Sequence, residues 1–178
     1  MIPSIKTISE LKRNINLGPG YGGYTEILKA INIPFEDWKA ICNFSDKKYT
    51  RNCISSCDEY ELLLMCWNKD QHSPIHSYHF QESWLKVLKG KLTIDVYQIN
   101  KEDMRTVRTG SITIGEGEYI YLNDNMGYHS IRNSGNNSTT SLHLNIDRVK
   151  EWEVFNEDSK TINKVTPSYD SATADCDY

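Results

Sequence analysis

Four of the five histidines lie where apolar and polar residues alternate along the chain. They are His76, His79, His129 and His143. Because successive side chains of a strand point to opposite faces, residues 76 and 78 share one face and residue 79 points to the other. Three imidazoles that converge inside a β-barrel would form a metal site with open coordination positions. Such a site suits non-haem iron and its reactions with oxygen and a substrate.

The five cysteines do not form a zinc-binding pattern. Cys53 and Cys57 form a CxxxC spacing beside Cys66, but no second short pair completes a set of four ligands. The number of cysteines is odd, and residues 1–20 contain no apolar signal segment. We therefore expect reduced thiols and a cytoplasmic protein.

Two periodicities divide the chain into elements that would position these side chains. Apolar residues at helical spacing, beginning with Ile8, Leu11 and Ile15, predict helices through residue 42. From Tyr60 onward the period is two. The expected strands are 60–68, 74–79, 84–89, 92–98, 104–109, 111–115, 118–122, 128–132 and 139–145. Short strands separated by turn residues are typical of a closed or nearly closed antiparallel β structure.

Length and charge exclude several classes of protein. The 178 residues fit one domain, and 20 basic against 24 acidic side chains give a formal net charge of −4. A mildly acidic chain lacks the attraction that drives non-specific binding to nucleic acid. No uncharged stretch approaches the roughly 18 residues of a membrane span. We expect neither nucleic acid nor a membrane as a partner.

A series of short motifs surrounds the histidines. In chain order they are Tyr49-Thr-Arg51-Asn52, Leu64-Met-Cys-Trp67, Ile75-His76, Leu85-Lys-Val-Leu-Lys-Gly90, Tyr121-Leu-Asn-Asp124, Gly127-Tyr-His129, Ser141-Leu-His143-Leu144 and Asn163-Lys-Val-Thr166. Together these motifs resemble the cysteine dioxygenase family, a group of cupin-fold thiol dioxygenases. The similarity runs in order from about residue 8 to residue 168.

The resemblance implies a mainly β fold. It would be a small cupin β-barrel, of the double-stranded β-helix or jelly-roll type, with N-terminal helices. We expect a single cupin domain over residues 1–168, divided into a helical front (7–42), a barrel (46–150) and a C-terminal extension (151–168). Residues 169–178 are small and acidic and are expected to form a disordered tail. The resemblance also favours a monomer.

The resemblance further implies an activity and its cofactor. Members of this family hold non-haem Fe(II) through three histidines and oxidise a thiol to a sulfinate, with both atoms of O2 entering the product. The substrate binds through its thiolate and amine, and an arginine receives its carboxylate. Arg51 matches that arginine, whose planar fork suits a carboxylate, and Tyr49 matches a tyrosine of the pocket. L-cysteine is the first substrate to test, followed by 3-mercaptopropionate.

The metal site departs from the family at one position. His76 and His129 match two ligands, but Tyr78 occupies the second position of the family's His-x-His motif and His79 follows it. A β-bulge could turn His79 inward, or Tyr78 could bind as a phenolate, which favours ferric iron. Alternatively, two histidines could bind metal weakly or not at all. The candidate ligands are therefore His76, His129, His79 and Tyr78, and iron, another divalent metal or no metal remain open.

Two further departures affect the substrate pocket. Ser83 and Asn145 stand where many members of the family have the cysteine and tyrosine of a thioether crosslink, so this crosslink cannot form. Asn145 could donate only a neutral hydrogen bond to the substrate. Ser141 and His143 remain from the family's Ser-x-His-x-Tyr relay and could orient groups or relay protons. In the alternative interpretation, His143 is a buried strand histidine that Ser141 satisfies.

These observations leave two functional hypotheses. The first is an iron-dependent enzyme resembling cysteine dioxygenase that oxidises a small carboxylate thiol with O2. The second is a non-catalytic or altered-chemistry cupin, either a pseudoenzyme or a module that binds a metal or another ligand. The changes at positions 78, 83 and 145 support the second hypothesis. The iron content and the oxygen uptake of the purified protein would separate the two.

Overall fold

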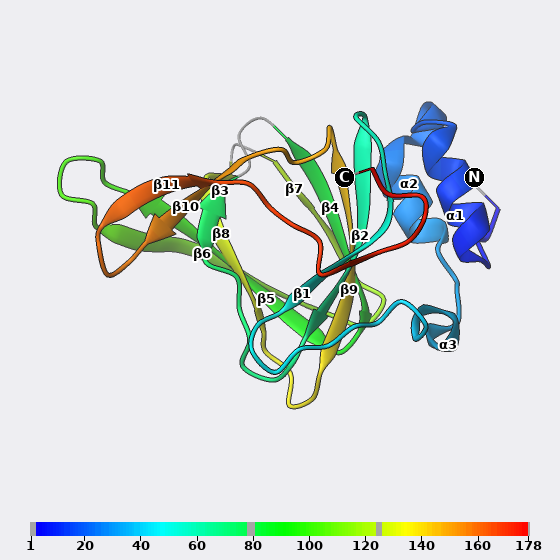
Figure 1. The fold of residues 1–178 in the computed structure, drawn as a ribbon, viewed down its shortest axis with the longest axis horizontal. Helices are drawn as coiled ribbons and strands as arrows, with labels where there is room; N and C mark the ends of the chain where they lie inside the picture. The colour runs from blue at the N-terminus through cyan, green and yellow to red at the C-terminus, as the bar shows by residue number, and fades with distance from the viewer. Residues whose placement is uncertain (1–2, 78–80, 124–125, 178) are drawn as a thin grey trace.

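The computed structural model describes residues 3–77, 81–123 and 126–177 (Figure 1). The helices are α1 (Ile8–Asn16), α2 (Gly23–Ala30) and α3 (Phe35–Trp38), with a 3-10 turn at Gly20–Gly22. The strands are β1 (Thr50–Ser56), β2 (Tyr60–Trp67), β3 (Ile75–Ser77), β4 (Glu82–Lys89), β5 (Lys91–Ile99), β6 (Thr106–Gly115), β7 (Tyr119–Leu122), β8 (Tyr128–Asn133), β9 (Thr139–Ile146), β10 (Trp152–Asn156), β11 (Thr161–Val165) and β12 (Ser171–Ala172). Among the described residues, no helix is both long and apolar enough to cross a membrane.

The strands form two six-stranded sheets that pack together as a barrel. Their orders are β12-β1-β2-β9-β4-β7 and β11-β10-β3-β8-β5-β6. A core cluster joins the two sheets, with Leu63 and Leu85 from the first and Leu92 and Ile131 from the second. This arrangement confirms the expected mainly β, jelly-roll architecture. The helices lie beside the first sheet (Figure 1).

The N-terminal helices cover the outer face of the first sheet. Thr7 caps α1 by accepting a hydrogen bond from the backbone N–H of Glu10 at 3.1 Å. Leu11 and Ile15 lie four residues apart on the buried face of α1 and pack in a cluster that includes Leu62. The helical front expected from the sequence therefore forms the cover of one sheet.

The apolar residues of strand β2 pack into two different cores, one on each face of the first sheet. Leu62 and Leu64 pack against the helices, whereas Leu63 and Met65 pack between the sheets. This alternation follows from the period of two in a strand. By the same period, Glu61 shares the inner face with Leu63, and it is fully buried. The single charge of β2 therefore points into the barrel.

The C-terminal segment differs from the expected disordered tail. Residues 166–177, here called the C-terminal strap, cross from β11 to β1 (Figure 1). Within the strap, β12 pairs in parallel with β1, with Asn52 opposite Ser171. The backbone N–H of Asp170 donates to the carbonyl of Arg51 at 2.8 Å. The tail is ordered here because it fills the hydrogen-bonding edge of β1, which its composition does not reveal.

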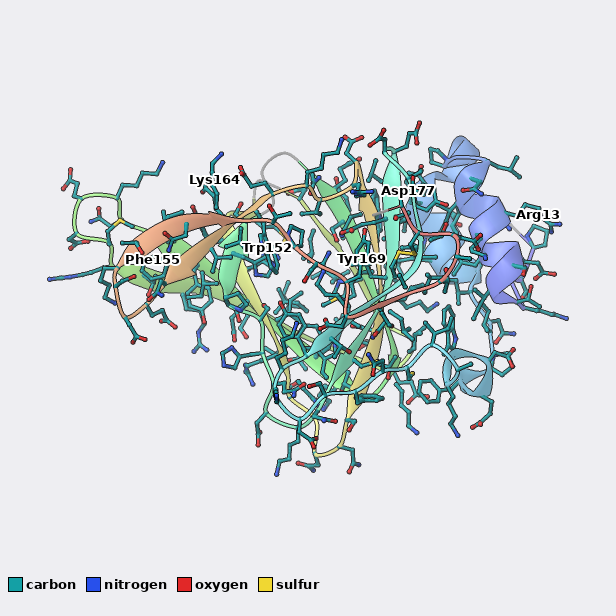
Figure 2. The ribbon with its side chains drawn as sticks, in the orientation of Figure 1. Arg13, Trp152, Phe155, Lys164, Tyr169 and Asp177 are labelled. Atoms are coloured by element: carbon teal, nitrogen blue, oxygen red, sulfur yellow. A yellow bond between two sulfur atoms is a disulfide. The ribbon has the colours of Figure 1, made fainter. Side chains whose placement is uncertain are left out.

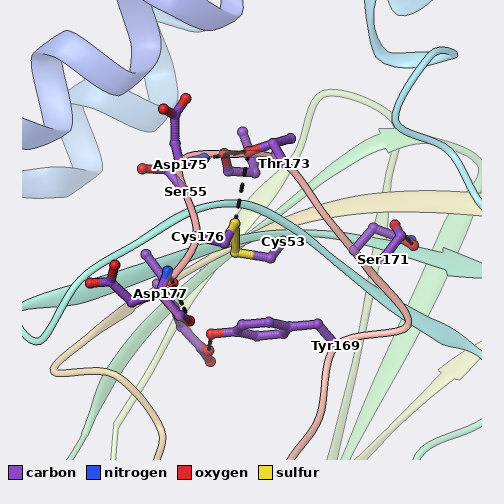
Figure 3. The surroundings of a disulfide bond; sticks show 12 residues. Cys53, Ser55, Tyr169, Ser171, Thr173, Asp175, Cys176 and Asp177 are labelled. Atoms are coloured by element: carbon purple, nitrogen blue, oxygen red, sulfur yellow. Dashed lines mark hydrogen bonds between the residues drawn. A yellow bond between two sulfur atoms is a disulfide. The ribbon is translucent and has the colours of Figure 1, made fainter.

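A disulfide fastens the strap to β1, so the expectation that all cysteines are reduced is wrong for two of them. Cys53 and Cys176 are bonded across a sequence separation of 123 residues (Figure 3). Cys42, Cys57 and Cys66 are free thiols. The odd cysteine count favoured reduced thiols, and it could not show that the fold brings Cys176 beside Cys53.

Asp95 of β5 ties together three strands of the second sheet. Its carboxylate accepts hydrogen bonds from Ser111 of β6 at 2.7 Å and from Arg132 of β8 at 3.1 Å. Burial by itself would raise the pKa of Asp95, but these hydrogen bonds and the charges of Arg132 and Arg108 outweigh it, and the net pKa is lowered. The carboxylate is therefore more stable as an anion in the folded than in the unfolded chain.

This arrangement predicts a pH-dependent effect of Asp95→Asn on stability. Because the folded pKa lies below the unfolded value of about 3.9, charged Asp95 stabilises the fold above about pH 4. The contribution is lost as the pH falls through the folded pKa. We expect urea denaturation at pH 7 to show a loss of about 1–2 kcal/mol, shrinking toward acid pH. Asp103→Asn, which removes an exposed ion pair with Arg105, is the control; an equal loss at all pH values would contradict the prediction.

Candidate active site

Two of the candidate metal ligands face each other across adjacent strands. His76 of β3 and His129 of β8 are register partners in an antiparallel pair, so their side chains lie on the same face of the sheet. Their ring centroids are 4.3 Å apart. Both residues are buried. The local pairing of β3 and β8 thus brings together two histidines that are distant in the sequence.

Both rings are held in the neutral form that binds metals. Burial, followed by the nearby His129, lowers the pKa of His76 well below its usual value. Burial lowers the pKa of His129 to about 4. His76 Nδ1 lies 2.8 Å from the carbonyl oxygen of Pro74, which can only accept, so Nδ1 carries the proton and the lone pair is on Nε2. A backbone carbonyl that orients a ring in this way is typical of metal-binding histidines.

The third ligand predicted from the sequence cannot be assigned, because Tyr78 and His79 lie outside the described residues. In the parts of the chain that are described, no three His, Cys, Asp or Glu side chains are grouped to hold a metal ion. The donors that are described, two buried neutral imidazoles side by side, fit a divalent transition metal as part of a ligand set. A complete set requires a further ligand.

His143 belongs to the same buried cluster but is held by a different network. Burial, followed by the charges of Arg51 and His129, lowers the pKa of His143 to about 3. Its Nε2 lies 2.9 Å from Ser141 Oγ, and Trp67 Nε1 donates to the same hydroxyl at 3.0 Å. Because Trp67 is a donor only, the hydroxyl proton of Ser141 is available to His143 Nε2. His143 is therefore a neutral ring that a buried serine orients.

Tyr49 reaches this network through stacking. Its ring stacks on Trp67, with centroids 4.6 Å apart and planes 17° apart. Tyr49 precedes β1, and burial raises the pKa of its hydroxyl. The hydroxyl therefore stays protonated at neutral pH, and the ring packs against the tryptophan that supports Ser141.

Arg51 of β1 is paired inside the barrel with Glu61 of β2. Arg51 Nη2 lies 3.1 Å from Glu61 Oε1, and both side chains are buried. Asn145 Nδ2 donates to Glu61 Oε1 at 2.6 Å, and the Tyr169 hydroxyl donates to Glu61 Oε2 at 2.9 Å. Three donors from β1, β9 and the C-terminal strap thus converge on one carboxylate.

Aromatic rings complete the surroundings of Arg51 and the histidines. The guanidinium carbon of Arg51 lies 5.6 Å from the centroid of the Trp152 ring. The same ring meets His76 edge-on at 4.8 Å. Figure 2 labels Trp152 on β10 and Tyr169 on the C-terminal strap. Because Trp152 contacts both Arg51 and His76, the candidate metal ligands and the arginine belong to one site.

Comparison with known proteins identifies the family to which this site belongs. The family described as cysteine dioxygenase type I matches residues 24–158. The chain belongs to the cysteine dioxygenase family. Cysteine dioxygenase type 1 from Rattus norvegicus and from Homo sapiens are each 26% identical over 148 residues, covering 82% of this chain and 74% of the relative. The relative from Danio rerio is 26% identical over 138 residues, covering 75% and 69%.

A solved structure supports the fold independently. An uncharacterised conserved protein with a double-stranded β-helix domain, from Klebsiella pneumoniae, has a TM-score of 0.50 and 11% sequence identity to this chain. The match covers 65% of this chain and 90% of that one. At this identity the likeness shows the fold alone, and it agrees with the barrel expected for the cysteine dioxygenase family.

Ser83 and Asn145, the residues that the sequence analysis placed at the family's crosslink positions, form one hydrogen-bonded row with Glu61. Ser83 and Asn145 are register partners on β4 and β9, and Asn145 and Glu61 are register partners on β9 and β2. Ser83 Oγ donates to Asn145 Oδ1 at 2.6 Å. This bond turns the amide nitrogen of Asn145 toward Glu61. The residues at the crosslink positions therefore hold Glu61 in place.

The sequence analysis did not identify Glu61, Trp152 or Tyr169 as parts of the site. Glu61 carried a signal, because it is the single charge in the apolar run of β2 and its parity places it inside the barrel. Trp152 and Tyr169 carried none, since each reaches the site through contacts between distant segments.

Proposed function

We propose that this chain is a non-haem iron thiol dioxygenase that oxidises a small thiol to its sulfinate with O2. The observation that carries the proposal is the pair of buried, neutral rings of His76 and His129, at the positions that match family ligands. Membership of the cysteine dioxygenase family supports the reaction class. L-cysteine, the small carboxylate thiol favoured by the sequence, is the reference substrate.

The proposed roles follow from the contacts of each side chain. His76 and His129 would hold Fe(II), with Tyr78 or His79 as the further ligand. When bound, ferrous iron would supply neighbouring coordination positions for the thiolate and O2. His143, whose Nε2 is held by Ser141, would orient neighbouring groups or relay protons. Tyr49, whose ring packs on Trp67, would line the substrate pocket.

The proposal extends to assembly. The family resemblance and the acidic, mixed-charge composition support a monomer without nucleic-acid or membrane partners. The cytoplasmic location expected from reduced thiols loses that support, because Cys53 and Cys176 are disulfide-bonded. Gel filtration with light scattering tests the monomer directly. A dimer at micromolar concentration would contradict it.

The test of the proposed function combines metal content with product analysis. We expect the protein purified with added Fe(II) to hold about one iron per chain and to consume O2 while forming a sulfinate from at least one thiol. The panel should contain L-cysteine, 3-mercaptopropionate and cysteamine. A protein that binds iron but oxidises none of the three would contradict the proposal.

Two variants would identify the further ligand in the same assay. Tyr78→Phe and His79→Gln each remove one candidate, and the variant that loses iron marks the ligand. If Tyr78 binds as a phenolate, the ferric protein shows a visible charge-transfer band that disappears in Tyr78→Phe.

The non-catalytic cupin remains a second candidate because of one specific observation. Arg51, the residue expected to receive the substrate carboxylate, is already paired with Glu61. A module that only binds a ligand would have no need to open the Arg51–Glu61 pair for catalysis. Tight binding of a thiol without oxygen consumption would favour this second candidate.

A further inference from the structure

We propose that Glu61 determines the substrate class of this site by occupying Arg51, so that the pocket selects small aminothiols without a carboxylate, such as cysteamine. The inference rests on the proposed thiol oxidation, and it names the substrate class of that same site. Its basis is the buried row Ser83–Asn145–Glu61–Arg51, which runs across four strands of one sheet.

The first step is the saturation of the Glu61 carboxylate. Oε1 accepts from Arg51 and Asn145, and Oε2 accepts from Tyr169. The Glu61 side chain is only 1% exposed, and that of Arg51 6%. A carboxylate with hydrogen-bond donors on both oxygens and a guanidinium beside it is held firmly in place. Glu61 thus holds a fixed negative charge against Arg51 Nη2, where an incoming substrate carboxylate would meet it.

The second step is the charge balance. Arg51 and Glu61 carry opposite charges and neutralise each other within the buried row. A substrate carboxylate would either share Arg51 with Glu61 or displace it. The first option places like charges together, and the second leaves a buried carboxylate without its cation. Each option weakens binding by roughly 100-fold or more.

The third step concerns the residues around the Arg51–Glu61 pair, which hold Glu61 in its position beside Arg51. Ser83 orients Asn145, and Asn145 donates to Glu61. Tyr169 reaches Glu61 from the C-terminal strap, which the Cys53–Cys176 disulfide anchors. A pocket that rejects one substrate class through a built-in repulsive group is a common route to specificity. An aminothiol has no carboxylate, so it is not repelled by the carboxylate of Glu61.

The experiment compares binding and turnover of three thiols by the wild-type protein and by Glu61→Gln. Anaerobic calorimetric titration of the iron-loaded protein gives Kd, and sulfinate formation gives kcat/KM. For the wild type we expect cysteamine to bind with a Kd about 100-fold lower, and to react with a kcat/KM about 100-fold higher, than L-cysteine and 3-mercaptopropionate. Glu61→Gln removes the negative charge beside Arg51 while keeping the side-chain shape, and the affinity and kcat/KM of the two carboxylate thiols should rise at least about 30-fold. Cysteamine should change by less than about threefold.

Two matched variants control the comparison. Glu59→Gln removes an exposed acid that lies just before Glu61 in the turn between β1 and β2. It should leave the Kd and the kcat/KM of all three thiols unchanged. Ser83→Ala loosens Asn145 without removing a charge and should shift the ratio in the same direction as Glu61→Gln, by a smaller factor. If Glu61→Gln does not fold, the preference of the wild-type protein for cysteamine over the two carboxylate thiols still tests the proposed substrate class.

The outcomes separate this inference from the proposed function. A wild type that binds L-cysteine or 3-mercaptopropionate more tightly than cysteamine overturns the inference, and sulfinate formation from that thiol would leave the proposed function standing. Absence of sulfinate from every thiol overturns the proposed function, whereas the titrations still decide the role of Glu61 because they need no turnover. A protein that binds none of the three thiols contradicts both.

Discussion

Replacing His129 with glutamine is expected to reduce iron binding by at least about 100-fold and to abolish sulfinate formation. The ring of His129 lies 4.3 Å from that of His76, centroid to centroid, and burial keeps both neutral. Changes to residues that only support metal ligands already weaken metal affinity by about 10–100-fold. Only two imidazoles of the proposed ligand set are described, and losing one of them should therefore weaken metal affinity by more than that range. Elemental analysis after dialysis against a weak chelator measures the effect.

The design of this test separates metal loss from misfolding. His129→Gln keeps much of the side-chain volume, and circular dichroism with thermal unfolding checks the fold. His72→Ala is the control, because His72 is an exposed histidine in the same segment as His76 and hydrogen-bonds to the backbone of Ser73. Iron content should be normal in His72→Ala. If His129→Gln and His76→Gln both keep one iron per chain, the proposed metal site is wrong.

Cys176→Ser is expected to lower the free energy of unfolding by about 3–5 kcal/mol. The Cys53–Cys176 bond closes a loop with a sequence separation of 123 residues, and loop-closure entropy for this length corresponds to about 5 kcal/mol. The effect should extend to the site, since the strap carries Tyr169 to Glu61. Urea denaturation of the wild type and the variant, each with and without reductant, measures the difference.

The disulfide prediction has a chemical control and a genetic one. Thiol titration of the denatured, unreduced wild type should find three free thiols, those of Cys42, Cys57 and Cys66. Cys57→Ser should leave the stability nearly unchanged, because Cys57 is a free thiol. Reductant should lower the stability of the wild type to that of Cys176→Ser and leave the variant unaffected. Five free thiols in the unreduced protein would contradict the prediction.

Local patterns predicted most of the barrel. Alternation identified β2, β4, β5, β8 and β9 to within about two residues at each end, and helical spacing identified α1 from Leu11 and Ile15. These signals are strong because one face of each element meets a core. The expected strands at 104–109 and 111–115 form a single strand, β6, because the chain passes Gly110 without turning.

Long-range pairing could not be predicted in the same way. Strand β1 has the polar sequence TRNCISS, yet all seven residues are buried, because β2 covers one edge and the strap the other. No local period shows such burial. The same reason hid the role of Glu61, since its donors Asn145 and Tyr169 lie 84 and 108 residues away in the sequence. Family resemblance identified Arg51 but not the carboxylate that meets it.

The C-terminal strap also affects how the protein behaves in a crowded solution. A strand at the border of a sheet presents unpaired backbone groups that can recruit a strand from another molecule. Along β1, the chain uses these groups itself, because Asp170 and Thr173 donate to the carbonyls of Arg51 and Cys53. Releasing the strap would therefore expose unpaired backbone groups along the edge of β1. By covering this edge, the strap protects the protein from self-association.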